Sequence, residues 1–178
     1  IMKSTLQKMT YLFLVIITLA SCKKGDPEES SNIAEGIIKA NVDGTWISTE
    51  SITSAANLVE RVGTLTLQGN TSGTNSKAFM FVINGFEGVG VYPIGGSNNI
   101  AVTGSYTEIT VNINNPMNTK TSVWQAPYTG GNEVGKVNVT EITDTYVKGT
   151  FEFGAKNSSD NTIKEIKDGS FHLKLKKS

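Results

Sequence analysis

From Ile33 to the end of the chain, apolar and polar residues alternate with a period of two almost everywhere. Because successive side chains of a β-strand point to opposite faces, this period is typical of strands with one face in a core and one in solvent. Short polar turns separate the runs, and no helical segment is long enough to connect parallel strands. The pattern therefore predicts an all-β domain, a single antiparallel β-sandwich or barrel of about nine to ten strands.

The chain from Glu35 to Ser48 is predicted to form a hairpin. Apolar residues share one face of its first half. Asp43 and Gly44 then supply a tight turn that tolerates positive φ, and Trp46 opens the returning strand.

A second segment, Ala78 to Ile83, is apolar on both faces. Strands of this kind are covered on both sides, so this one is predicted to lie in the middle of the fold. The stretch from Ser51 to Glu60 contains two alanines, a leucine and a valine, and is the one place where a short helix is expected. That helix could provide the cover.

The remaining strands are predicted where apolar residues alternate between turns. They are Gly63–Gln68, Gly88–Ile94, Ile109–Ile113, Val123–Ala126, Val137–Thr140, Val147–Phe153 and Phe171–Leu175.

Residues 1–21 have the organisation of a cleaved signal peptide. Lys3 and Lys8 lie in a start without acidic residues, and an apolar run of about ten residues follows, half of the roughly 20 that a membrane-spanning helix needs. Ala20 and Ser21, both small, then precede Cys22, the single cysteine of the chain. These features predict a lipoprotein signal in which the Cys22 thiol accepts diacylglycerol as a thioether.

The lipid on Cys22 would anchor the protein to a membrane, since each buried methylene contributes about 0.8 kcal/mol. Residues 22–32 are polar and charged, which predicts a flexible tether, and the all-β domain follows at residues 33–178. A lysine rather than an aspartate after Cys22 favours outer-membrane sorting, by analogy with enterobacterial lipoproteins. We expect a lipid-anchored outer-membrane protein that faces the periplasm or the cell surface.

The charge balance argues against nucleic acid as a partner. The chain has 16 basic and 16 acidic residues, and removal of Lys3 and Lys8 with the signal peptide leaves 14 against 16. The basic residues are scattered, whereas binding to a phosphate backbone needs a basic surface.

Catalytic chemistry has little support in the sequence. His172 is the only histidine, and it is expected to be exposed on the polar face of the last strand, between Ser170 and Lys174. With Cys22 committed to lipid there is no set of metal ligands, and no glycine-rich phosphate loop precedes a helix. We therefore expect a protein that is not an enzyme and that carries no cofactor.

Several segments resemble an uncharacterised family. They are Ala40-Asn-Val-Asp-Gly-Thr-Trp46, Val139-Thr-Glu-Ile-Thr-Asp144, Val147-Lys-Gly-Thr-Phe-Glu-Phe153 and Ile166-Lys-Asp-Gly-Ser-Phe171. The last three resemble the C-terminal signature of a domain of unknown function common in lipoproteins of Bacteroidota. The resemblance extends over Ile37 to Leu175 and implies no activity.

Within this signature, the glycines and aromatic residues are interpreted as structural. Gly149 and Gly169 are expected where the sheet bends or bulges, and Phe151, Phe153 and Phe171 are expected to fill the core.

A lipocalin-like carrier of a small apolar ligand is the alternative. Gly44-Thr45-Trp46 resembles the Gly-X-Trp motif of lipocalins, but a full strand precedes it, and the only arginine, Arg61, is far from the end where a lipocalin has one. The two hypotheses differ in one observable. The phenylalanines at 79, 81, 151 and 153 should fill the interior of a binding module and line an open cavity in a carrier.

Four aromatic residues are candidates for stacking on sugar rings: Trp124, Tyr128, Tyr92 and Tyr106. Pro127 and two nearby glycines give Trp124 and Tyr128 a loop-like setting. Together these observations predict a non-enzymatic binding module for a glycan or an envelope protein.

Overall fold

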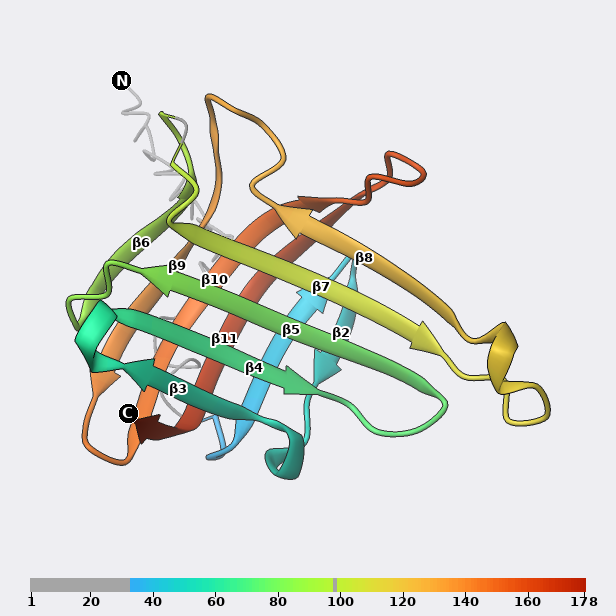
Figure 1. The fold of residues 1–178 in the computed structure, drawn as a ribbon, viewed down its shortest axis with the longest axis horizontal. Helices are drawn as coiled ribbons and strands as arrows, with labels where there is room; N and C mark the ends of the chain where they lie inside the picture. Colours follow the sequence, from blue (N-terminus) through green and yellow to red (C-terminus); the bar gives the residue numbers. More distant parts are fainter. Residues whose placement is uncertain (1–32, 98) are drawn as a thin grey trace, which may run out of the picture.

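A computed structural model describes residues 33–97 and 99–178, and strands dominate it (Figure 1). Eleven strands lie in these ranges, where the sequence predicted nine to ten. They are β1 (Ile37–Val42), β2 (Thr45–Ser48), β3 (Ala55–Val59), β4 (Thr64–Asn70), β5 (Asn75–Asn84), β6 (Gly90–Gly95), β7 (Val102–Thr110), β8 (Lys120–Ala126), β9 (Glu133–Ile142), β10 (Tyr146–Lys156) and β11 (Ile163–Lys177). Three short 3₁₀ turns accompany them: η2 (Ser51–Thr53), η3 (Glu60–Val62) and η4 (Pro116–Asn118). The all-β prediction is confirmed.

The strands form two layers that face each other. The front sheet has the order β3-β4-β5-β7-β8, and the back sheet has the order β2-β1-β11-β10-β9-β6 (Figure 1). The layers join at two corners. At one, Leu175–Lys177 of β11 pairs with β3, the only parallel pairing among the described strands; at the other, Lys156 of β10 pairs with Gln125 of β8. The result is a sandwich whose corners close in the manner of a barrel.

Aromatic rings fill the space between the layers. Phe81 of the front sheet packs against Phe151 and Phe153 of the back sheet, with ring centroids 4.7 and 5.3 Å apart. Phe79 contacts Phe151 at 5.9 Å, and Phe171 stacks on Phe151 at 6.5 Å. All five rings are buried. The predicted core role of Phe151, Phe153 and Phe171 is therefore confirmed.

The predicted hairpin at Glu35–Ser48 is present as β1 and β2. Val42 pairs with Thr45, so Asp43 and Gly44 alone make the turn, with φ values of 48° and 88°. Positive φ at both positions gives a turn whose twist matches that of the strands. The side chain of Asn41 accepts a hydrogen bond from the Gly44 amide at 2.7 Å and holds this turn.

The two glycines of the signature lie at bulges, as predicted. The register between β9 and β10 shifts next to Gly149, where a Cβ atom would lie 2.1 Å from the Asn138 carbonyl oxygen. The register between β10 and β11 shifts beside Gly169, where a Cβ would lie 2.4 Å from the Phe151 ring. Close approach of neighbouring groups requires glycine at both positions.

The expected helix within Ser51–Glu60 is wrong. This stretch contains strand β3, flanked by the turns η2 and η3. Ala56 and Leu58 face the core, and Asn57 between them faces outward. The burial of its residues thus alternates with a period of two. β3 pairs with β4 on one side and with the distant end of β11 on the other.

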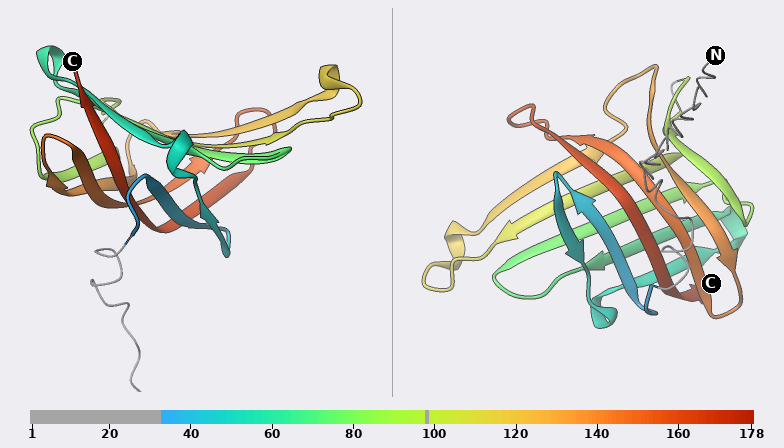
Figure 2. Two further views of the ribbon diagram at one scale, coloured as in Figure 1. Left: turned by 90° about the horizontal axis from the view of Figure 1, so that it is seen from below. Right: turned by 180° about the vertical axis from the view of Figure 1, so that it is seen from behind.

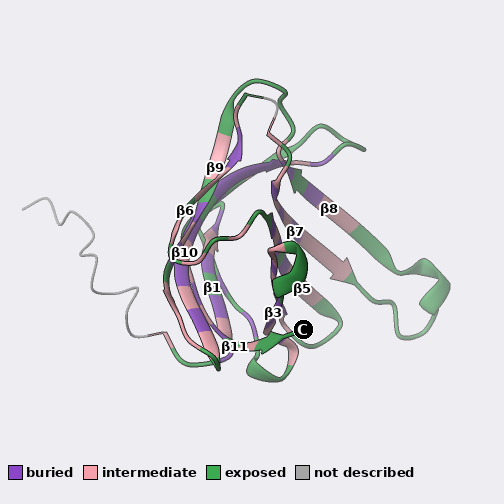
Figure 3. Cartoon of the chain, turned by 60° about the vertical axis from the view of Figure 1, so that its left-hand side comes forward, coloured by how far each residue is buried: buried purple, intermediate pink, exposed green. Residues whose placement is uncertain are grey.

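The strand predicted at Ile109–Ile113 is displaced, because the real strand is β7, which ends at Thr110. Its inward residues are Val102, Gly104 and Tyr106. A Cβ on Gly104 would lie 3.2 Å from Phe81, so the glycine makes room for a ring and weakens the alternation of the strand. Beyond the strand, the β7–β8 hairpin extends past the rest of the body (Figure 2), and its tip is exposed (Figure 3).

The prediction for Ala78–Ile83 is half correct. The segment belongs to β5, which lies in the middle of the strand order. However, its inward residues are buried while Met80, which points outward, is 43% exposed. No described segment crosses in front of this strand in Figure 1. Among the residues that the structure describes, nothing therefore provides the expected cover on the outer face.

The predicted signal peptide, Cys22 and the tether lie outside the described residues. Within the described residues, no helix has the length and apolar character needed to cross a membrane.

Candidate functional site

The outer face of the front sheet carries no charged side chain along its five strands. The charged residues of these strands, such as Lys77 and Glu108, occupy the alternate positions that point to the inner side. The outward positions hold threonine, serine, asparagine, glutamine and small or medium apolar residues.

By contrast, the outer face of the back sheet is heavily charged. Lys136 pairs with Glu152 at 3.0 Å, and Lys148 pairs with Glu141 at 3.3 Å. Three of these side chains are about half exposed and Lys148 is about one-quarter exposed, as is usual for charged residues on a protein surface. The two outer faces of the molecule thus differ sharply in chemical character.

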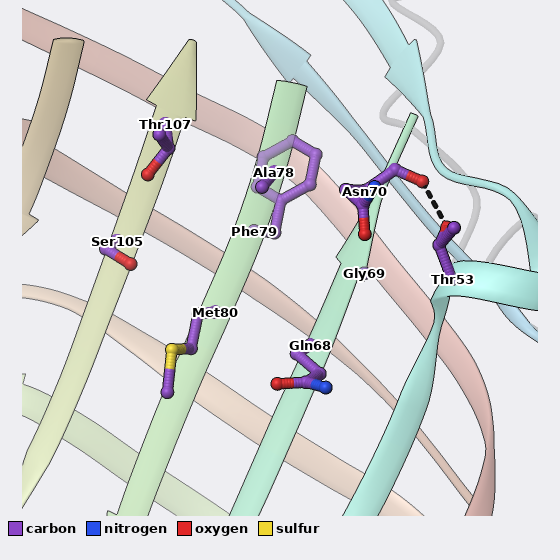
Figure 4. Close-up of a pocket in the computed structure, with 9 residues that line it drawn as sticks. All are labelled: Thr53, Gln68, Gly69, Asn70, Ala78, Phe79, Met80, Ser105 and Thr107. Atoms are coloured by element: carbon purple, nitrogen blue, oxygen red, sulfur yellow. Dashed lines mark hydrogen bonds between the residues drawn. The ribbon is translucent and has the colours of Figure 1, made fainter. Parts of the chain in front are cut away.

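A hollow of about 260 Å³ lies at the centre of the uncharged face (Figure 4). Strand register places its side chains in two rows. Gln68, Met80 and Ser105 are paired across β4, β5 and β7, and the next row is Asn70, Ala78 and Thr107. Thr53 of η2 lies at one end. Ala78 contributes only a methyl group, so the floor lies lower there than the side chains around it.

Some polar groups around the hollow are already engaged. The Thr53 hydroxyl donates to the Asn70 carbonyl oxygen, and the Asn70 amide nitrogen donates to the Thr71 carbonyl oxygen at 3.2 Å. The side chains of Gln68, Ser105 and Thr107 have no hydrogen-bond partner among residues 33–97 and 99–178. Three polar side chains, one on β4 and two on β7, therefore remain open to a ligand.

Two of the aromatic residues singled out from sequence lie inside the body. Trp124 is only 6% exposed, and its indole nitrogen donates to the Thr162 hydroxyl at 2.9 Å. Tyr106 is buried beside it, with ring centroids 5.9 Å apart. Burial raises the pKa of Tyr106, and the hydrogen bond to Glu108 raises it further.

The other two aromatic candidates lie apart from these and from each other. Tyr92 of β6 stacks on Phe86 at 5.5 Å and donates its hydroxyl to the Gly88 carbonyl oxygen. Tyr128 follows β8 and is 36% exposed. The structure brings only Tyr106 and Trp124 together. Trp46, which the sequence analysis did not consider for stacking, is 53% exposed on β2 beneath the Lys39 ammonium.

His172 is less exposed than expected. Its ring is half-buried on the outer face of the back sheet, with Nδ1 3.2 Å from the Ile33 carbonyl oxygen and the Tyr146 ring edge-on at 5.1 Å. The N-terminal residues of the described chain lie over it, which the strand pattern alone does not reveal. Nearby, the Tyr146 hydroxyl donates to Glu141; this hydrogen bond raises the pKa of Tyr146 and lowers that of Glu141.

No three histidine, cysteine, aspartate or glutamate side chains of the described ranges are grouped as metal ligands would be. The hollow was not predicted from the sequence. Its only signal was the apolar character of both faces of Ala78–Ile83, which was interpreted as evidence for a cover.

The fold and the site define a class of protein: a two-layered β-domain with a packed interior and an open, uncharged outer sheet. The chain belongs to the family described as Domain of unknown function (DUF6252), whose model matches residues 34–173. This agrees with the family resemblance found in the sequence. No curated protein and no solved structure matches the chain significantly.

Proposed function

We propose that the chain is a lipoprotein, anchored by Cys22 to the outer membrane of a bacterium of the Bacteroidota, that acts as a non-enzymatic binding module. Its ligand is a glycan or an envelope protein, held on the outer face of the front sheet. The observation that carries this proposal is the uncovered middle strand β5, whose outward residues Ala78, Met80 and Val82 meet solvent.

The chemistry of this face suits recognition better than simple solvation. Protein interfaces are depleted in charge at their centre and enriched in methionine, with polar groups around the rim. The centre of this face is Met80, and amide and hydroxyl side chains surround it.

The packed interior favours an external site over the lipocalin-like carrier. The rings of Phe79, Phe81, Phe151 and Phe153 lie in mutual contact, with centroid separations from 4.7 to 6.3 Å. An apolar ligand inside would have to displace them.

The anchor is tested by mass spectrometry of the full chain produced in a bacterial host with lipoprotein processing. We expect the mature product to begin at an acylated Cys22 and a Cys22→Ser variant to leave the membrane fraction. A free thiol at Cys22 would overturn the anchor.

The binding face is tested with Met80→Glu, which places a charge at its centre, and with Thr150→Glu at a matched place in the middle of the back sheet. Polysaccharide and outer-membrane protein fractions of the source bacterium serve as probes. We expect Met80→Glu to weaken binding at least tenfold and Thr150→Glu to leave it unchanged. Binding that tolerates Met80→Glu would place the ligand elsewhere.

A further inference from the structure

We propose that the hollow between β4, β5 and β7 binds one ring of a neutral saccharide. This inference rests on the proposed function and names the ligand class of the same face.

Apolar and polar groups are arranged in the hollow in a way that suits a sugar ring. The Ala78 methyl group and the Met80 thioether form an apolar centre, and Gln68, Ser105 and Thr107 stand around it (Figure 4). A pyranose ring has the complementary structure, with C–H groups on its faces and hydroxyl groups at its rim. The floor can take a ring face, while the amide and hydroxyls exchange hydrogen bonds with the ring hydroxyls.

The charge of the lining favours a neutral ligand. No charged residue is among those that line the hollow. An anionic ligand such as a phosphate, a sulfated sugar or a uronic acid would lose hydration on binding without meeting a cation. A neutral ligand does not incur this cost.

The size of the hollow suits one sugar ring. Pockets that enclose drug-sized molecules have volumes of about 300–1,000 Å³. The hollow, at about 260 Å³ and open to solvent, is smaller. It accommodates a single ring, and further residues of an oligosaccharide would extend over the neighbouring threonines of the face.

The structure also offers a direct spectroscopic reporter. Met80 lies in the hollow, and Met117 lies at the tip of the β7–β8 hairpin, 93% exposed. With ¹³C-methyl methionine in the full chain, the Met80 methyl resonance reports on the hollow and the Met117 resonance serves as an internal control. The probes are glucose, galactose, mannose, N-acetylglucosamine and their oligomers, with oligogalacturonate as the acidic comparison.

We expect a neutral saccharide to shift the Met80 resonance in a saturable manner and to leave Met117 in place. Ala78→Leu fills the hollow from the solvent side, and Ser105→Ala removes one hydrogen-bonding hydroxyl. Ala78→Leu should abolish the shift, and Ser105→Ala should weaken the affinity about tenfold. Val59→Leu, on the same face but at the end of β3 far from the hollow, should leave affinity unchanged.

Three results would overturn the proposal: no saccharide moves Met80, oligogalacturonate binds as tightly as its neutral counterparts, or Ala78→Leu binds normally. If no saccharide binds while Met80→Glu still abolishes binding to envelope fractions, the saccharide inference fails and the proposed binding face stands. If Met80→Glu has no effect on envelope binding either, both fail.

Discussion

Glu108 of β7 connects the front sheet to the back sheet. Its carboxylate accepts a hydrogen bond from the Tyr106 hydroxyl at 2.9 Å and pairs with Lys77 at 3.5 Å and Lys164 at 3.6 Å. Lys164 comes from the back sheet and also pairs with Asp43 at 3.3 Å. Burial alone would raise the pKa of Glu108, but the hydrogen bond from Tyr106 and the two lysine charges together outweigh it, so the pKa lies below its usual value.

Replacement of Glu108 by glutamine should destabilise the protein near neutral pH. A carboxyl group with a lowered folded-state pKa stabilises the fold above its unfolded-state pKa and loses that contribution as the pH falls through the folded-state value. Since the side chain is one-third exposed, we expect a loss of about 1 kcal/mol at pH 7. Urea unfolding at several pH values measures it, and the gap to wild type should close toward pH 3.

Glu152→Gln is the matched control, because its pair with Lys136 is solvent-exposed on both sides. It should change stability by less than about 0.5 kcal/mol. A Glu108→Gln deficit that stays constant from pH 7 to pH 3 would show that shape rather than charge matters at this position.

At the level of elements, local alternation was a good guide where the inward positions are large and apolar. The β1–β2 hairpin was predictable because its turn residues and its inward apolar residues lie within one short segment. β7 was misplaced because Gly104 interrupts its inward row, and the room it leaves belongs to rings from other strands. β3 was misinterpreted because its two pairing partners cannot be recognised from the local pattern. One is β4, which follows it in the chain, and the other is the end of β11, which is distant in sequence.

The pairing of β11 with β3 should be a cooperative part of the fold. Leu175, Lys176 and Lys177 pair with β3, and the Ser178 amide donates to the Leu58 carbonyl oxygen at 3.0 Å. A chain that ends at Lys174 loses these hydrogen bonds and the packing of Leu175, which together are worth about 3 kcal/mol. Hydrogen exchange should show β3 amides losing protection while those of β9 keep it.

Lys177→Ala is the control that distinguishes the contribution of the Lys177 side chain to stability from that of the backbone pairing. It removes only the ion pairs to Asp144 at 2.6 Å and Glu60 at 3.7 Å, both on exposed acids. Its effect should stay below about 0.5 kcal/mol. If the truncated chain keeps full protection in β3, this corner contributes nothing to closing the sandwich.

At the scale of the whole molecule, the candidate site could be only partly predicted. The sequence located the central strand and its unusual outer apolar residues. Whether a second layer covers that face depends on how all the strands are arranged, and an alternation pattern holds no information on this. The same limit applies to Trp124 and Tyr106. They pair across β7 and β8 on the inward-facing positions, and which face of these strands is inward depends on the whole arrangement.

The packed interior of the molecule is expected to exclude apolar ligands. Phe81 fills the centre through its contacts with Phe151 and Phe153. Phe81→Ala should cost about 3–5 kcal/mol and leave a dry void that takes up benzene. Phe81→Leu, a milder change of about 1–1.5 kcal/mol, covers the case in which the alanine variant does not fold.

Wild-type protein titrated with cis-parinaric acid should give no saturable fluorescence increase, because the rings already occupy the space. The opposite result would be that the wild type binds one equivalent of cis-parinaric acid and that Ala126→Phe, which blocks the interior, abolishes this binding. It would mean that the two sheets separate to admit an apolar ligand, as in a carrier.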